Sequence, residues 1–141
     1  MKLLIINQPQ EVIEGYTVVD LRVGLDELEQ VINNSCTDIA LTNCLDSLNK
    51  QEAKSVLNLA ASKMRLGAKM SISGIELKSL CRNALNNSLS SDQFSDIISG
   101  MNCIFTSNEI SELVNSVGLR IDTISVQGHL YDIKVSRPNT N

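Results

Sequence analysis

A chain of 141 residues has the length of one domain, and its content of 43% hydrophobic and 20% charged residues is ordinary for a soluble globular protein. The net charge of −4, without any cluster of lysine and arginine, argues against a nucleic-acid partner, and no apolar run approaches the length of a membrane span. We therefore expect one domain over residues 1–136 and a polar, frayed tail over residues 137–141, with no nucleic-acid or membrane partner.

The four cysteines, Cys36, Cys44, Cys81 and Cys103, are widely spaced and form no C-x-x-C pair. A disulfide framework is therefore not expected, and one histidine with scattered thiols does not predict a metal site. The apolar start of the chain is too short for a signal peptide. Buried, reduced thiols are typical of a cytoplasmic protein, which is the location that we expect.

The first third of the chain predicts three strands and one helix. Residues 2–6 form a continuous apolar run, which is typical of a strand covered on both faces. A connection punctuated by Gly15 leads to a β-branched second strand over residues 16–21. Residues 24–33 carry apolar side chains at helical spacing, and residues 37–42 predict the third strand.

The clearest helix begins after Asn49, which can cap it, and Glu52 lies three positions later in a capping-box arrangement. Apolar side chains then recur at helical spacing. Gly67 occupies the place of a left-handed C-terminal cap. A fourth strand is predicted over residues 68–73, and Gly74 is expected to break it.

The second half of the chain predicts three helices and a hairpin. The helices are expected over residues 75–86, 91–98 and 107–117. Thr106 and Glu109 form a second capping box at the start of the last helix, and Gly118 ends that helix. Residues 119–126 and 130–136 predict two strands joined by a turn that contains Gly128.

The order of these elements predicts the fold class. Alternating strands and helices favour an α/β, Rossmann-like domain: a mostly parallel sheet with helices on both faces. The closing hairpin adds a C-terminal antiparallel pair of strands to that sheet.

With these elements in place, the chain resembles the class I S-adenosylmethionine-dependent methyltransferases. The resemblance is to small members that open K-L-x-L-G-C-G and continue with I-x-G-(W/Y/F)-x-N-V-D, H-V-L-E-H and L-K-P-G-G. The corresponding stretches in this chain are KLLIINQ at 2–8, IEGYTVVD at 13–20, NCLDS at 43–47 and RLGAK at 65–69. The usual ending is matched by FTSNE at 105–109, GL at 118–119 and SRP at 136–138. The resemblance covers nearly the whole chain in order and spacing.

The resemblance implies a reduced class I methyltransferase fold, with a cofactor crevice at the carboxyl ends of the strands. The short segment between Asp20 and Asp38 implies that one edge strand of the family is reduced or absent. Five positions are candidates for the crevice: Asn7, Gln8, Asp20, Asn43 and Asp46. We assign no catalytic residue and no metal ligand among them.

The departures from the family pattern fall at this crevice. Ile6, Asn7 and Gln8 replace the G-C-G turn that would let the backbone approach the cofactor, and Pro9 removes a backbone N–H. In H-V-L-E-H both histidines and the glutamate are changed, to Asn43, Ser47 and Asp46.

The surviving polar residues each allow two interpretations. Asp20 matches the acid that would hold the ribose hydroxyls, but an ordinary strand-end residue that caps a loop is the favoured interpretation. Asn43 and Asp46 follow a parallel strand, where open α/β sheets place ligands. Either they orient a ligand, or Asp46 simply opens the loop before Asn49; the sequence favours neither.

We therefore predict a methyltransferase-like domain with a degenerate active site. In this hypothesis it has lost S-adenosylmethionine binding, needs no cofactor and acts as a non-catalytic binding or assembly module. The alternative is an active methyltransferase with S-adenosylmethionine in a diverged loop, and a third hypothesis places another small ligand in the crevice. The expected partner is a protein, including a second copy bound through a sheet edge or a helix face.

Overall fold

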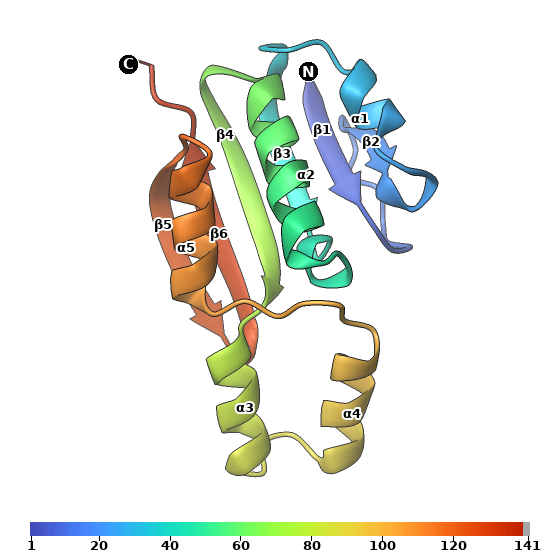
Figure 1. Cartoon of the computed structure of the whole chain (residues 1–141), viewed down its shortest axis with the longest axis vertical. Coiled ribbons are helices and arrows are strands. Elements are labelled where there is room, and N and C mark those ends of the chain that lie inside the picture. Colours follow the sequence, from blue (N-terminus) through green and yellow to red (C-terminus); the bar gives the residue numbers. More distant parts are fainter. Residues whose placement is uncertain (140–141) are drawn as a thin grey trace.

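The computed structural model describes residues 1–139 and contains one six-stranded sheet in the order β2-β1-β3-β4-β6-β5 (Figure 1). The strands β2, β1, β3 and β4 pair in parallel, whereas β6 pairs antiparallel with both β4 and β5. Their bounds are β1 Lys2–Ile6, β2 Thr17–Asp20, β3 Cys36–Thr42, β4 Met64–Ile75, β5 Arg120–Gln127 and β6 Leu130–Ser136. The predicted α/β class, with a mostly parallel sheet and a C-terminal antiparallel hairpin, is confirmed.

Five α-helices connect these strands. They are α1 Asp26–Gln30, α2 Lys50–Lys63, α3 Leu77–Leu85, α4 Ser91–Ser99 and α5 Ser107–Ser116. The predicted caps of α2 and α5 are confirmed: the Asn49 side chain accepts from the backbone N–H of Glu52, and Thr106 forms a capping box with Glu109. A second capping box, formed by Ser90 and Gln93, begins α4 and lies outside the sequence predictions.

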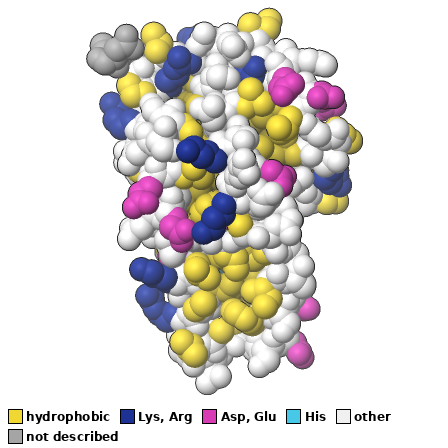
Figure 2. Space-filling model, in the orientation of Figure 1, with side chains coloured by type: hydrophobic (Ala, Val, Ile, Leu, Met, Phe, Trp, Pro, Cys, Tyr) yellow, Lys and Arg dark blue, Asp and Glu magenta, His cyan; other side chains and the backbone are white. Residues whose placement is uncertain are grey.

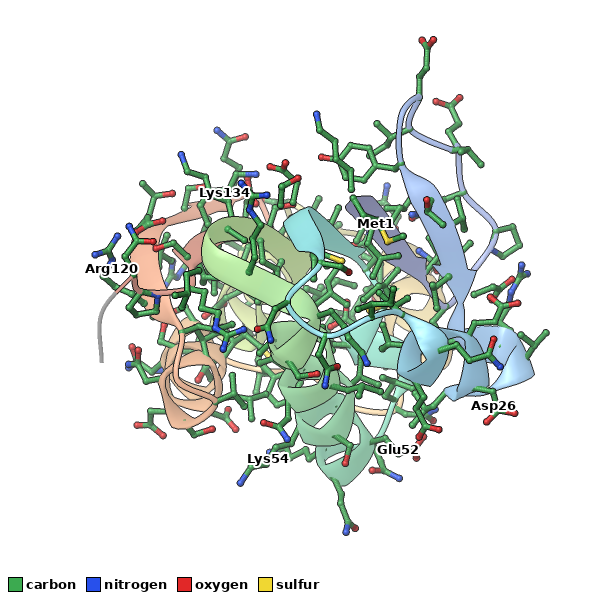
Figure 3. All side chains as sticks on the ribbon, turned by 90° about the horizontal axis from the view of Figure 1, so that it is seen from above. Met1, Asp26, Glu52, Lys54, Arg120 and Lys134 are labelled. Carbon is green, nitrogen blue, oxygen red and sulfur yellow. The ribbon has the colours of Figure 1, made fainter. Side chains whose placement is uncertain are left out.

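Helices α1, α2 and α5 lie against one face of the sheet, and most of the core lies between them and the strands (Figure 1). Figure 3 shows this layering from above: Glu52 and Lys54 point outward on the helical side, and Lys134 points away from the opposite face. The polar side chains Asp38, Ser71 and Lys134 alternate along their strands with the core residues Ile39, Met70 and Ile133.

The second face differs from the prediction, because no helix covers it within residues 1–139. The right-handed crossover rule assigns this face to the connection from β1 to β2. That connection, residues 7–16, is shorter than the dozen or more residues that a helical crossover needs, and it contains Pro9. Only a small cluster forms there, in which Tyr16 and Val18 pack on buried residues of β1 and β3.

Three local predictions are corrected. The helix expected over residues 24–33 is reduced to the five residues of α1, after a short 3₁₀ helix. Strand β4 begins at Met64, directly after α2, so Gly67 does not cap a helix. Gly67 adopts φ +76° within β4, beside the shift in register between β3 and β4. Gly74 does not break the strand, which continues to Ile75.

The first residue of the predicted frayed tail, Arg137, is hydrogen-bonded to β4. The backbone N–H of Arg137 donates to Ala68 O at 3.0 Å, and Arg137 O accepts from Gly67 N at 2.9 Å. The Arg137 guanidinium also donates to Asn34 Oδ1 at 2.5 Å. These bonds extend the pairing of the chain end with β4, whereas residues 140–141 of the predicted tail lie outside the described residues. Within residues 1–139, no helix has the length and apolarity of a membrane span.

Candidate functional site

The candidate site lies where the parallel strands β1 and β3 end side by side, the edge at which open α/β sheets bind ligands. A cleft of about 280 Å³ opens there. Three of the five predicted positions, Gln8, Asn43 and Asp46, line this cleft together. Its other lining residues are Ser47, Ile75, Asp96, Ile97, Gly100, Met101 and Leu130.

Asn7, the fourth predicted position, closes the edge of this crevice. Its side-chain amide donates to Ser47 Oγ at 2.7 Å, and Ser47 Oγ in turn donates to Cys44 O at 3.2 Å. The turn after β1 is therefore hydrogen-bonded to the turn after β3. The family pattern has cysteine at this position and glycine at positions 6 and 8, so the bond belongs to the altered turn of this chain.

Ile6 has a packing role that the glycine of the family pattern does not have. Its side chain is 7% exposed and belongs, with Leu4 and Ala40, to the small cluster on the second face of the sheet. Tyr16 and Val18 complete that cluster. Since no helix lies over this face, Ile6 supplies part of the apolar cover of β1.

Asp46 is the most constrained residue of the site. It lies in the 3₁₀ helix Leu45–Ser47 and is 6% exposed. Its backbone carbonyl accepts from Asn102 N at 2.8 Å, and its carboxylate Oδ2 accepts from Ile75 N at 3.1 Å. Within residues 1–139, Oδ1 has no hydrogen-bond partner. Burial raises the pKa of the carboxyl to about 6, although the bond from Ile75 opposes the shift.

A second unpartnered group lies close to Asp46. Tyr131 on β6 is buried, and its hydroxyl has no hydrogen-bond partner in the described part of the chain. A Cβ added at Gly74 would lie 2.7 Å from Tyr131 Oη and 3.0 Å from Asp46 Oδ1. Because Gly74 has no side chain, Tyr131 Oη and Asp46 Oδ1 can both lie close to its backbone. The pKa of Tyr131 lies well above its usual value because of burial and the nearby Asp46.

Asn43 marks the end of β3. It adopts φ +51°, a left-handed conformation that asparagine tolerates better than most residues. Its backbone N–H donates to Ser73 O on β4 at 3.0 Å. The conformation turns the chain away from the sheet toward Asp46, so Asn43 serves the local backbone as well as lining the cleft.

Asp20, the fifth predicted position, lies apart from the cleft. It ends β2 opposite Ile6 and caps the following 3₁₀ helix by accepting from Arg22 N at 3.0 Å. Arg22 also forms a 2.6 Å ion pair with the carboxylate. These hydrogen bonds lower the pKa of Asp20. The structure therefore brings four of the five candidates to one crevice and occupies the fifth with a local partner.

Residues from the second half of the chain complete the site, and the sequence had not indicated them. Asn102 Nδ2 donates to Ser47 O at 2.6 Å, and the segment around Met101 covers the cleft between α4 and α5. Tyr131 lies in a predicted strand and Gly74 was interpreted as a strand break. Neither belongs to a local motif, so only the three-dimensional structure shows their approach to Asp46.

No protein-family model and no curated protein matches this sequence. Its structure matches many solved chains. A SAM-dependent methyltransferase from Archaeoglobus fulgidus has a TM-score of 0.62 at 12% identity, over 86% of this chain and 68% of that one. An O-methyltransferase family protein from Burkholderia thailandensis has a TM-score of 0.63 at 16% identity, over 89% of this chain.

A third match is the 1,6-didemethyltoxoflavin-N1-methyltransferase of Burkholderia thailandensis, whose structure contains S-adenosylhomocysteine, with a TM-score of 0.59 at 14% identity over 88% of this chain. The chain spans 37% of the O-methyltransferase family protein and 52% of this enzyme. The strand order, the closing hairpin and these similarities agree: the chain has the class I S-adenosylmethionine-dependent methyltransferase fold.

Proposed function

We propose that this domain is a non-catalytic binding or assembly module that has kept the methyltransferase fold but does not hold S-adenosylmethionine. The observation that carries the proposal is the hydrogen bond from Asn7 to Ser47, which joins the turns after β1 and β3. In related nucleotide-binding folds, a glycine-rich turn leaves the corresponding space for the ligand.

The size of the remaining cleft supports this proposal. Pockets that bury small molecules have volumes of about 300–1,000 Å³. The cleft of about 280 Å³ lies at the lower limit of that range. Hydrogen bonds from Asn102 to Asp46 and Ser47 hold the segment around Met101 over the cleft. The fold itself therefore keeps the cleft covered.

The cleft also lacks a cationic partner for the carboxylate at the amino-acid end of the cofactor. Among the described residues, no lysine or arginine lines it. Pro9 lacks a backbone N–H, and no helix N-terminus follows β1 to attract an anion. Asp20 is engaged by Arg22 instead of being free for ribose hydroxyls.

Calorimetric titration with S-adenosylmethionine and S-adenosylhomocysteine tests the proposal. We expect no binding heat for the wild type at millimolar ligand. The variant Ile6→Gly/Gln8→Gly restores the two glycines of the family pattern and should recover some affinity for S-adenosylhomocysteine. The control Asn87→Gly, at an exposed residue with φ +62° on a different turn, should not. Micromolar affinity of the wild type, equivalent to about −8 kcal/mol, would reject the proposal and restore the active methyltransferase hypothesis.

A further inference from the structure

Helices α3 and α4 form a pair beyond the carboxyl end of the sheet (Figure 1), and most of its apolar surface is not buried. Leu80 is the one buried residue of α3, and α4 has none. Leu85 is 85% exposed and Ile98 is 39% exposed. An apolar hollow of about 720 Å³ lies along α3, with Leu77, Cys81 and Leu85 at a spacing of four residues.

This surface is continuous across both helices. Figure 2 shows one broad hydrophobic area over the α3–α4 pair, larger than the apolar areas over the neighbouring elements. Phe94 and Ile97 on α4 are only half-buried. Contiguous apolar area of this kind marks an interaction site more often than isolated exposed side chains do.

The charges beside this area differ between the two helices. Lys78 and Arg82 are the charged residues of α3, and Asp92 and Asp96 are those of α4. Figure 2 shows basic side chains along one side of the hydrophobic area and acidic side chains along the other. Within residues 1–139, none of these four has an ion-pair partner.

We propose that the same α3–α4 face of a second copy of this chain covers this surface. A two-fold axis parallel to the helix pair places the basic side of each copy against the acidic side of the other, so the opposite charges meet along both sides of the interface. Lys78 and Arg82 then face Asp92 and Asp96 across the dimer, and the apolar side chains of both helices pack between them. The inference rests on the proposed assembly role and names its partner as the chain itself.

Charge exchange tests this arrangement. The variant Lys78→Glu/Arg82→Glu makes both helices acidic, and Asp92→Lys/Asp96→Lys makes both basic, so each variant alone repels its own copy. Mixed together, the two restore opposite charges at both contacts. Sedimentation equilibrium should give twice the monomer mass of 15.4 kDa for the wild type and for the mixture, and the monomer mass for each variant alone.

Leu85→Glu should also give monomers, because it places a charge within the apolar area. Leu66→Glu is the matched control, since Leu66 is 58% exposed at the opposite end of β4 and should leave the dimer intact. Circular dichroism and thermal unfolding of each variant establish that it is folded. A monomeric wild type at micromolar concentration, or a mixture of folded variants that stays monomeric, would overturn the proposal.

The cofactor titration on the same samples separates the two proposals. A wild-type dimer that binds S-adenosylmethionine would reject the proposed loss of cofactor binding and leave the α3–α4 interface standing. A monomer that binds no cofactor would reject the interface alone.

Discussion

Replacing Asp46 by asparagine should stabilise the protein at neutral pH, although the carboxylate accepts a hydrogen bond from Ile75. Asparagine has nearly the same shape, can still accept that bond and removes the charge. Asp46 is 6% exposed, and its Oδ1 has no hydrogen-bond partner among the described residues, so the ionised carboxylate is poorly solvated.

The magnitude follows from the pKa of Asp46, which is raised from 3.8 to about 6 in the folded protein. Each pKa unit corresponds to about 1.36 kcal/mol, so ionisation of Asp46 should lower the free energy of unfolding by about 3 kcal/mol. Because the folded pKa is the higher one, the loss begins near the unfolded pKa and is complete above the folded pKa. Asp46 therefore favours the folded state at acidic pH, and that stability disappears as the pH rises through about 6.

Urea unfolding of the wild type and of Asp46→Asn between pH 3 and pH 8 measures this effect. The two free energies of unfolding should agree at the acidic end and diverge to about 3 kcal/mol in favour of the variant above the folded pKa. Parallel pH profiles for Asp46→Asn and the wild type would show that ionisation of Asp46 does not destabilise the fold.

Three further predictions concern the same crevice and the α3–α4 face. Gly74→Ala should destabilise the fold by about 1–3 kcal/mol, and adding Tyr131→Phe should recover part of that loss in a double-mutant cycle; equal losses with and without Tyr131→Phe would contradict the close approach. Asn7→Ala should lower the free energy of unfolding in urea by about 0.5–1.5 kcal/mol, and the losses caused by Asn7→Ala and Ser47→Ala should be less than additive in the double variant, because both remove the hydrogen bond that the two side chains share; fully additive losses would argue against that bond. Cys81 should react with a neutral maleimide faster than the three buried cysteines, because its side chain is exposed in the single chain. The rate of this reaction should rise on dilution as the dimer dissociates, and a rate independent of protein concentration would argue against burial of Cys81 in a dimer.

Much of the fold was predictable because its signals are local. The apolar run of β1, the Asn49 cap of α2 and the Thr106 capping box each lie within a few residues of the element that they define. Helix α1 and the start of β4 were less predictable. The apolar spacing after Gly24 continues past the end of α1, and Gly67 has the left-handed φ of a helix cap although it lies in a strand.

The cover of the second sheet face illustrates a different limit. Alternating strands and helices predicted helices on both faces, but the rule gives no length for each crossover. The ten-residue connection after β1 is too short for a helix, so Ile6 and Tyr16 form a small cluster in its place. The length of that connection can be read from the sequence. That it leaves one face of the sheet without a helix follows only once the strand order is known.

The candidate site was predictable in part. Gln8, Asn43 and Asp46 meet because the carboxyl ends of neighbouring parallel strands lie together, which the strand order implies. Asp46 contacts Ile75, which is 29 positions away along the chain, and Asn102, which is 56 positions away. No local sequence motif predicts either contact. Such contacts depend on the path of the chain through α3 and α4, which carries it away from the end of β4 and brings Asn102 back beside Asp46.

Amide chemical shifts of isotopically labelled protein test directly, at the residues concerned, whether the crevice is closed to the cofactor. Heteronuclear correlation spectra are recorded while S-adenosylhomocysteine is added to millimolar concentration. The amide signals of Asn7, Gln8 and Asn43 should stay in place throughout. Saturable shifts of these three signals would show that the ligand enters the crevice and that the crevice is not closed to the cofactor.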